Sequence, residues 1–283
     1  MTDGNVYPSD TLSGLFGAPL RRLEVVESTN SLLKAEAELG RAVAGAVIVA
    51  EHQTAGRGRM DRRWEAPPGK GLLFSVLLYP DLEPDRLPLV GLMIGLSVCQ
   101  SIGSTILQSA NRFNDAKAFE SDQNSAFRAP QSALTLKWPN DILAGGRKLC
   151  GILCESGVDP QGRRFIVAGV GLNVNQTIED LSSELRRTAT SLYLITGATQ
   201  PRDPLLGSIL KGIESGCRRL QTENSDWVIV EWLQRSESVG KRLTVSLGTS
   251  KREGICEGLE PNGALRLRVA DGSLKIIHSG DVI

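Results

Sequence analysis

The sequence predicts an α+β protein that ends in a small all-β module. Up to residue 236, apolar positions with a helical period alternate with short apolar runs, a pattern typical of helices mixed with buried strands. After Gly240 the pattern changes to short alternating segments separated by turn dipeptides. With 41% hydrophobic and 23% charged residues among 283, the composition is that of a folded chain. We expect a tail over 1–20, a large domain over 21–236 and a small domain over 237–283.

The first helix is expected to begin just after Ser28. Ser28 and the two residues that follow are good helix caps, and good helix formers continue to Leu39. Val43–Ala50 is an apolar run with β-branched residues and therefore predicts a buried strand. A loop rich in Gly and Arg follows over 52–70.

A second strand and a long helix come next. Leu72–Tyr79 is strand-like, and apolar residues recur at every fourth position from Val90 to Ile106, which predicts a helix that begins after Pro88. The polar stretch 110–132 has no apolar period and is expected to be an excursion between elements.

The rest of the large domain predicts a sheet rich in hairpins, followed by two helices. Strands are expected at Ala133–Trp138, Lys148–Glu155 and Arg164–Val174, joined by short turns. Helices are expected at Leu206–Leu220 and Trp227–Leu233. In the last domain, Asn-Gly and Asp-Gly dipeptides between alternating segments predict β-hairpins.

Charge and composition limit the function. The formal net charge is zero, so only a local patch could bind an anionic polymer or surface. No uninterrupted apolar run approaches the roughly 20 residues of a spanning helix, and the N-terminus lacks the pattern of a signal peptide. We expect a cytoplasmic chain without a membrane partner. The five cysteines form no CxxC pair, which favours reduced and mostly buried thiols.

The segment 56–71 concentrates positive charge in this neutral chain. Its basic side chains are Arg57, Arg59, Arg62, Arg63 and Lys70, against the acidic Asp61 and Glu65. Glycines between them let the backbone approach a ligand closely, and arginine offers two parallel donors to a phosphate or carboxylate. The segment predicts an anion site, although a solvated basic loop would have the same composition.

Gly169, Gly171 and Asn173 alternate along one predicted strand. A dinucleotide-binding fingerprint, GxGxxG, would need glycine at its sixth position, which is Val174 here. That motif is therefore not supported. Two glycines on one strand face could form a flat shelf for a planar ring, with Asn173 as a hydrogen-bonding partner. Close packing within a sheet would explain the glycines equally well.

Lys148 is unusual because it enters a largely apolar strand. Simple alternation places it on the same face as Cys150 and Ile152, with Gly151 on the other face. A buried ammonium needs an anionic partner, unless the lysine only marks the edge of the strand. Asp141 precedes it in the segment KWPND.

Five motifs follow one another along the chain: ESTN over 27–30, EHQTAGRGRMDRRW over 51–64, LKWPNDIL over 136–143, RKLCGILCE over 147–155 and AGVGLNVN over 168–175. Together they closely resemble biotin protein ligase, the biotin–[acetyl-CoA carboxylase] ligase. The region from Val239 resembles the small C-terminal domain of that family. The resemblance implies a catalytic domain like class II aminoacyl-tRNA synthetases and biotin synthetases, with a mixed sheet, and a C-terminal SH3-like β-barrel.

The resemblance also implies a reaction in two steps. Biotin and Mg-ATP give biotinoyl-5′-AMP, and a lysine of the biotin carboxyl carrier protein of acetyl-CoA carboxylase then takes the biotin. The implied biotin-binding residues are Ser28, Thr29, Gln53, Gly56, Arg57, Lys148 and Gly151. Those implied for ATP and the adenylate are Arg59, Trp64, Lys148, Gly169, Gly171 and Asn173. The implied catalytic residues are Lys148, Arg57, Arg59 and Asp141, and no metal ligands are assigned.

The chain departs from the family pattern in two places. Asp61 replaces a glycine in the pattern GRGRxGRxW. Because of this replacement we expect the loop to close more slowly or to retain the adenylate intermediate less well. Few residues precede Glu27, so we expect a ligase that does not bind DNA and lacks the DNA-binding domain of some relatives. For its assembly, a monomer and a homodimer both stay open. A lipoate or octanoyl ligase-transferase and a non-catalytic biotin-binding protein are the alternatives.

Overall fold

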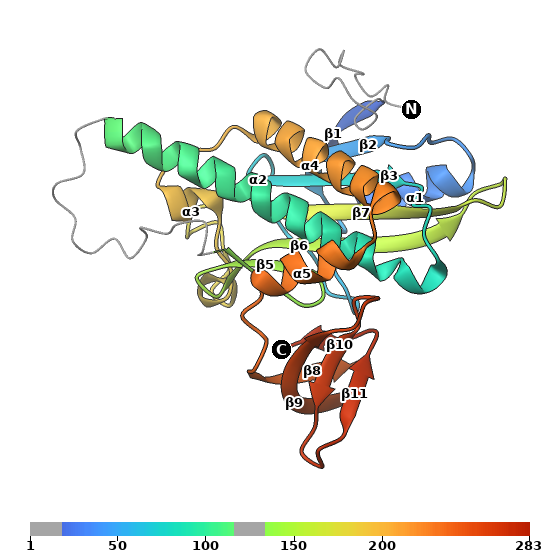
Figure 1. Ribbon diagram of the computed structural model, residues 1–283. Coiled ribbons are helices and arrows are strands. Elements are labelled where there is room, and N and C mark those ends of the chain that lie inside the picture. The colour runs from blue at the N-terminus through green and yellow to red at the C-terminus, as the bar shows by residue number, and fades with distance from the viewer. Residues whose placement is uncertain (1–18, 116–133) are drawn as a thin grey trace.

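A mixed sheet of seven strands forms the centre of the larger unit (Figure 1). The computed structural model describes residues 19–115 and 134–283. The strands lie in the order β1-β2-β3-β7-β6-β5-β4, in which only β1 and β2 are parallel neighbours. Their bounds are β1 Leu20–Val26, β2 Val47–Gln53, β3 Gly71–Leu78, β4 Leu134–Lys137, β5 Asp141–Ala144, β6 Arg147–Val158 and β7 Arg164–Asn173. The predicted α+β class with a mixed sheet is confirmed.

Helices cover the two faces of this sheet unequally. On one face lie α2 (Pro88–Asp115), α4 (Arg202–Thr222) and α5 (Asp226–Gln234), and Figure 1 shows α2 and α4 side by side across the strands. Their apolar side chains join the larger core. On the other face α1 (Thr29–Glu38) packs through Leu33 against Phe165 and its neighbours in a smaller cluster. Shorter helical turns are η1 Pro84–Arg86, η3 Leu185–Arg187 and α3 Leu192–Thr196.

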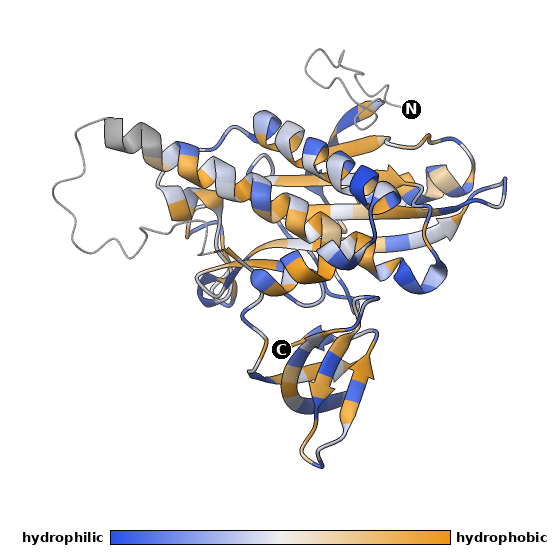
Figure 2. Cartoon of the chain, in the orientation of Figure 1, coloured by the Kyte–Doolittle hydropathy of each residue, from blue (hydrophilic) through white to orange (hydrophobic). Residues whose placement is uncertain are grey.

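The helix α2 is long and apolar enough to pass the length and hydropathy criteria for a membrane span. Most of it is buried, and Met93, Ile94 and Ile102 have no exposed surface. Figure 2 shows largely hydrophobic strands beneath helices of mixed character. This burial is that of a core helix. The sequence argument considered only uninterrupted apolar runs and therefore overlooked how apolar the helix is.

The helix α1 begins where the sequence predicted. Ser28 has an extended backbone and its side chain accepts a hydrogen bond from Ser31 N, which makes it the N-cap. Ser28, Thr29 and Asn30 are almost completely buried although all three are polar. The first turn of the helix therefore places hydrogen-bonding groups inside the protein.

A β-bulge in β6 changes the face on which Lys148 lies. Asp141 pairs with Gly151 and Ile142 with Cys150, but Leu143 pairs with Lys148, so Leu149 is the extra residue. Leu149 and Cys150 are both buried in the larger core. The prediction that Lys148 shares a face with Cys150 and Ile152 is wrong, because the bulge breaks the alternation and turns Lys148 to the side of Gly151.

Five strands of the C-terminal part form a separate antiparallel sheet in the order β11-β10-β9-β8-β12. The strands are β8 Arg242–Leu247, β9 Ser250–Leu259, β10 Leu265–Arg268, β11 Leu274–Ile277 and β12 Asp281–Val282. This sheet is the predicted small SH3-like domain. The indole N–H of Trp138, a buried residue of the large domain, donates to Gly263 O at 3.0 Å and so joins the two sheets.

Other differences from the predictions concern element bounds. The strands β1 and β5 were not predicted, and β2 continues to Gln53 instead of ending at Ala50. Residues 110–115 belong to α2 and not to the expected excursion, because the helix continues to Asp115. Residues 116–133 and most of the expected tail lie outside the described part of the chain. All five cysteines are free, and Cys154 is exposed.

Candidate functional site

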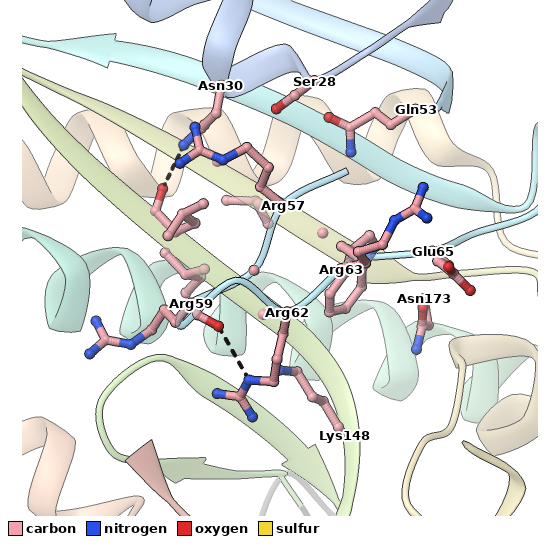
Figure 3. Close-up of a pocket in the computed structure, with 18 of the residues that line it drawn as sticks. Ser28, Asn30, Gln53, Arg57, Arg59, Arg62, Arg63, Glu65, Lys148 and Asn173 are labelled. Atoms are coloured by element: carbon pink, nitrogen blue, oxygen red, sulfur yellow. Dashed lines mark hydrogen bonds between the residues drawn. The ribbon is translucent and has the colours of Figure 1, made fainter. Parts of the chain in front are cut away.

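A cavity of about 270 Å³ lies on the α1 face of the sheet, beside the first turn of that helix. The loop after β2, the strands β6 and β7, and the segment 181–189 complete its walls (Figure 3). The predicted site residues among its lining are Ser28, Thr29, Gln53, Arg57, Arg59, Trp64, Lys148, Gly151, Gly169, Gly171 and Asn173. Of the predicted residues, Gly56 and Asp141 do not line it.

One end of the cavity is a network of polar side chains built before any ligand arrives. The backbone N–H of Thr29 donates to Gln53 Oε1 at 2.8 Å, and the Thr29 hydroxyl lies 3.1 Å from the same oxygen. The hydroxyl of Ser75, which is fully buried, lies 2.7 Å from both Thr29 Oγ1 and Asn30 Oδ1. Such a network holds its donors and acceptors in fixed directions and suits a polar ring with defined hydrogen-bonding groups.

Gly169 leaves room for a protein side chain. A Cβ at this position would overlap Asn30 Oδ1, while Asn30 Nδ2 donates to Leu153 O at 3.1 Å and to Glu155 Oε2 at 3.0 Å. The space is needed for Asn30. Gly169 also lines the cavity, so its implied role in binding the adenylate stays a prediction.

Gly151 and Gly171 form a shelf, whereas the glycine pattern predicted one from Gly169 and Gly171. Gly151 and Gly171 are paired directly across β6 and β7, and the indole of Trp64 lies against both. A Cβ at Gly171 would overlap the indole ring, and one at Gly151 would lie 2.9 Å from Trp64 Cζ3. The planar ring on this shelf is therefore that of Trp64, and not a ligand ring lying directly on the glycines.

Lys148 has the anionic partner that its position required. Its Nζ lies 2.7 Å from Asp141 Oδ1, and 5.5 Å from the centre of the Trp64 ring. Both side chains of the ion pair are largely buried, with exposed fractions of 33% for Lys148 and 18% for Asp141. Asp141 stands behind the lysine and outside the cavity lining, so it can orient the ammonium group without occupying the site.

The segment 56–64 is a small hairpin that covers the cavity. Arg57 and Arg63 form a β-bridge, and Trp64 N donates to Gly56 O at 3.0 Å. A Cβ at Gly56 would overlap Trp64 O, so this glycine shapes the hairpin instead of lining the site. Met60 and Asp61 occupy the turn with φ of 50° and 57°. Two successive positive φ angles are those of a type I′ turn, in which glycine is preferred at the second position.

Three of the four arginines of the hairpin are held by a carboxylate, whereas Arg63 Nη2 donates to Thr54 O at 2.8 Å. Arg57 makes a two-point contact with Glu155, with Nη1–Oε2 at 3.2 Å and Nη2–Oε1 at 3.1 Å. Arg59 Nε donates to Asp281 Oδ1 at 3.0 Å, and Arg62 contacts the other oxygen of Asp281. Asp281 belongs to β12, so the C-terminal domain contributes directly to the cover of the site.

The arginines and Lys148 share one cavity but their charged ends do not meet in this state. Figure 3 shows the guanidinium groups of Arg57 and Arg59 turned away from Lys148. Burial lowers the pKa of the Arg59 guanidinium from its ordinary value, which adds to the need for a carboxylate beside it. The predicted grouping of Arg57, Arg59 and Lys148 is thus present in the lining, and ligand contact would require the arginines to exchange partners.

Some site residues were missed by the sequence argument. Asn30 and Asn140 line the cavity, and both stand inside the quoted motifs. Leu181, Leu185 and Ala189 come from a segment without any motif. Only the three-dimensional path of the chain brings this segment over the site, because Lys148 N donates to Thr188 O and Thr190 N donates to Lys148 O.

We predict that Asp281→Asn loosens the hairpin. An amide carries no charge for Arg59 and Arg62, and a partly buried arginine that loses its partner is costly. Trypsin cleavage after the arginines of segment 56–64 is expected to become about tenfold faster. A loss of about 1.4 kcal/mol in the free energy that favours the closed hairpin raises the population of the open hairpin tenfold. Asp271→Asn, on an exposed turn of the same domain, is the control. Equal cleavage rates for the Asp281 variant and the unmodified chain would show that the C-terminal domain does not hold the hairpin.

Comparison with known proteins agrees with this geometry. Residues 23–174 match the biotin/lipoate A/B protein ligase family, and residues 239–283 match the biotin protein ligase C-terminal domain. The biotin–[acetyl-CoA-carboxylase] ligase of Mycobacterium tuberculosis is 33% identical over 94% of this chain and 90% of its own length. The bifunctional ligase/repressor BirA of Bacillus spizizenii is 30% identical over 99% of this chain and 79% of its own length.

Solved structures give the same result. The biotin protein ligase of Aquifex aeolicus in complex with biotin and ATP superposes with a TM-score of 0.70 at 28% identity, covering 93% of this chain and 97% of that one. The biotin protein ligase of Leishmania major in complex with biotin gives a TM-score of 0.57 at 24% identity over 91% of this chain and 97% of that one, which shows the fold alone. The chain belongs to the biotin/lipoate A/B protein ligase family.

Proposed function

We propose that this chain is an ATP-dependent biotin protein ligase. In the first step a biotin carboxylate oxygen attacks the α-phosphorus of ATP; the bond to the β-phosphate breaks, and pyrophosphate leaves. In the second step a carrier lysine amine attacks the acyl carbon; an amide forms, AMP leaves and the amine loses a proton. The observation that carries the proposal is a single cavity with a buried polar network at one end and Lys148, Arg57 and Arg59 in its walls.

The cations suit the first step. Negative charge builds on the phosphate oxygens and on the leaving pyrophosphate, and fixed positive groups in a partly buried site stabilise that charge. Lys148 is the best placed, because Asp141 already orients it at 2.7 Å. Arg57 and Arg59 would exchange Glu155 and Asp281 for the ligand, which would then hold the hairpin in place over itself.

The polar network suits the bicyclic head of biotin. A ureido ring offers two N–H donors and one carbonyl acceptor, which match a site built from Ser28, the Thr29 hydroxyl and the Gln53 amide. Gly151 lines the same cavity, and its lack of a side chain makes room for Trp64 and Lys148. The C-terminal residues 239–283 match the C-terminal domain of biotin protein ligases, which favours biotin over lipoate.

The adenylate would lie along Trp64 and Asn173. Both line the same cavity, with Trp64 supported from behind by Gly151 and Gly171. Among the described residues, no group of three or more His, Cys, Asp or Glu side chains could hold a metal ion. Mg²⁺ would accordingly enter on the phosphate oxygens of Mg-ATP, as part of the substrate.

The second step needs protection of the intermediate. An acyl phosphate anhydride reacts with water, so the hairpin 56–64 has to exclude solvent until the carrier arrives. The names of relatives, such as the Mycobacterium tuberculosis biotin–[acetyl-CoA-carboxylase] ligase, support the biotin carboxyl carrier protein of acetyl-CoA carboxylase as the partner. We propose that this transfer takes place in the cytoplasm.

The function is tested by incubating the chain with labelled biotin, Mg-ATP and an apo carrier domain. We expect pyrophosphate release and label on the carrier, and about a hundredfold lower rate for Lys148→Met, since the loss of one charge-stabilising group costs about that much. Lys241→Met, an exposed lysine of the C-terminal domain, is the control and should keep the full rate.

Three results would contradict the proposal in different ways. Transfer of lipoate but not biotin would assign the chain to the other branch of the family. Biotin binding without pyrophosphate release would make it a binding protein. An unchanged rate of biotin transfer for Lys148→Met would show that Lys148 is not a catalytic residue.

We predict that Asp61→Gly holds the intermediate better. Asp61 has φ of 57°, which glycine adopts without the cost of about 1 kcal/mol that a side chain carries there. The release rate of biotinoyl-5′-AMP from the loaded enzyme should fall about fivefold, from the same free energy. Asp61→Asn removes the charge but keeps a side chain at the positive φ, so it should lower the release rate less than Asp61→Gly does. Release from Asp61→Gly at the original rate would show that the turn does not limit closure.

A further inference from the structure

Two contacts together fix the orientation of the Asn173 amide. Asn173 Nδ2 donates to Thr190 O at 2.9 Å. A carbonyl oxygen can only accept, so the NH₂ group of Asn173 makes this contact, which favours the orientation in which Oδ1 faces the other way. There it accepts a hydrogen bond from Gln176 Nε2 at 3.0 Å. The two contacts together prevent the amide from turning over.

Gln176 is itself held in place from both sides. Its side chain is 1% exposed, and its backbone carbonyl accepts from Ser191 Oγ at 2.6 Å. Ser191 in turn is the N-cap of α3, where its hydroxyl accepts from Leu194 N at 3.1 Å. Gln176 Oε1 has no hydrogen-bond partner among the described residues. A fully buried glutamine with one unpaired atom is a costly way to fill space, so its donation to Asn173 calls for a reason.

Thr190, the neighbour of Ser191, also contacts Lys148. Thr190, which is fully buried, accepts from the Asn173 amide through its carbonyl and donates through its N–H to Lys148 O at 2.9 Å. The residue proposed to read the base and the residue proposed to meet the phosphate are therefore fixed by one short stretch of chain. A substitution of Gln176 would disturb Asn173, because the two side chains are hydrogen-bonded, but would not contact Lys148.

With these contacts made, Asn173 keeps one N–H and one oxygen lone pair for a ligand. This donor–acceptor pair matches adenine, which presents an amino group at position 6 beside a ring nitrogen that accepts. Hypoxanthine carries a carbonyl at position 6, so its oxygen would face Asn173 Oδ1 without a proton between them. An amide free to turn over would accept either base with one hydrogen bond.

We propose that Gln176 is a positioning residue that locks the Asn173 amide and thereby selects ATP over ITP. The inference rests on the proposed function, in which ATP is the substrate and Asn173 lies against its base. Asn173 touches the nucleotide, and Gln176 acts only through it.

The test is Gln176→Glu, with the KM values for ATP, ITP and biotin measured by pyrophosphate release. A carboxylate cannot donate to Asn173 Oδ1, so the amide is expected to turn or to move. The KM for ATP should rise about tenfold, the usual value of one hydrogen bond, and the preference for ATP over ITP should fall by a similar factor. The KM for biotin should not change, because the biotin end of the cavity is built from other residues.

Two further variants separate positioning from general damage. Gln176→Met has similar length, no charge and no donor, and should reproduce the loss of selectivity even if the Glu variant fails to fold. Gln200→Glu places the same new charge at a glutamine 5% exposed that bonds to Thr196 and Ala198, and should leave the ATP preference intact.

An unchanged ratio of ATP to ITP use in Gln176→Met, with an active unmodified chain, would overturn this inference and leave the proposed function standing. An equal rise in the KM for biotin and ATP would also overturn it, since that is the sign of a disturbed fold. No pyrophosphate release by the unmodified chain would overturn the proposed function, and this inference with it.

Discussion

The ion pair between Lys148 and Asp141 is the interaction on which the site depends. It exists because Leu149 bulges out of β6, so that Lys148 leaves the core side of the sheet and turns toward the cavity. An ammonium group without Asp141 would be costly in this half-buried position. One extra residue in a strand thus converts a lysine that simple alternation would send into the core into an oriented positive charge.

The remaining cations follow the same rule. Positive groups in a partly buried site need anionic partners, and here Glu155 holds Arg57 while Asp281 holds Arg59 and Arg62. Because Asp281 lies in the C-terminal domain, the small β-sheet takes part in closing the site of the large domain. The hairpin 56–64 is therefore tied at both ends, and substrate binding would have to compete with carboxylates of the protein.

The sequence allowed the fold class, the start of α1, the SH3-like domain and eleven of the cavity-lining residues to be predicted, since these depend on local pattern or motif. The predicted strand face of Lys148 was wrong, because no local sequence pattern reliably indicates a β-bulge. A glycine shelf was predicted from Gly169 and Gly171, but the structure forms it from Gly151 and Gly171, because it depends on the pairing of β6 with β7 and on where the hairpin returns. Asp281 and Gln176 were not predicted, because their partners are distant in sequence or lie outside any motif.

The central claim is that Asp141 aims Lys148 at the charged centre of an acyl-adenylate. Calorimetric binding of a phosphonate analogue of biotinoyl-5′-AMP to the unmodified chain and to Asp141→Asn tests it most directly. The account predicts that the variant binds the analogue at least about tenfold more weakly, which corresponds to 1.4 kcal/mol, while its affinity for biotin alone is unchanged. Equal affinity of the two proteins for the analogue would contradict it.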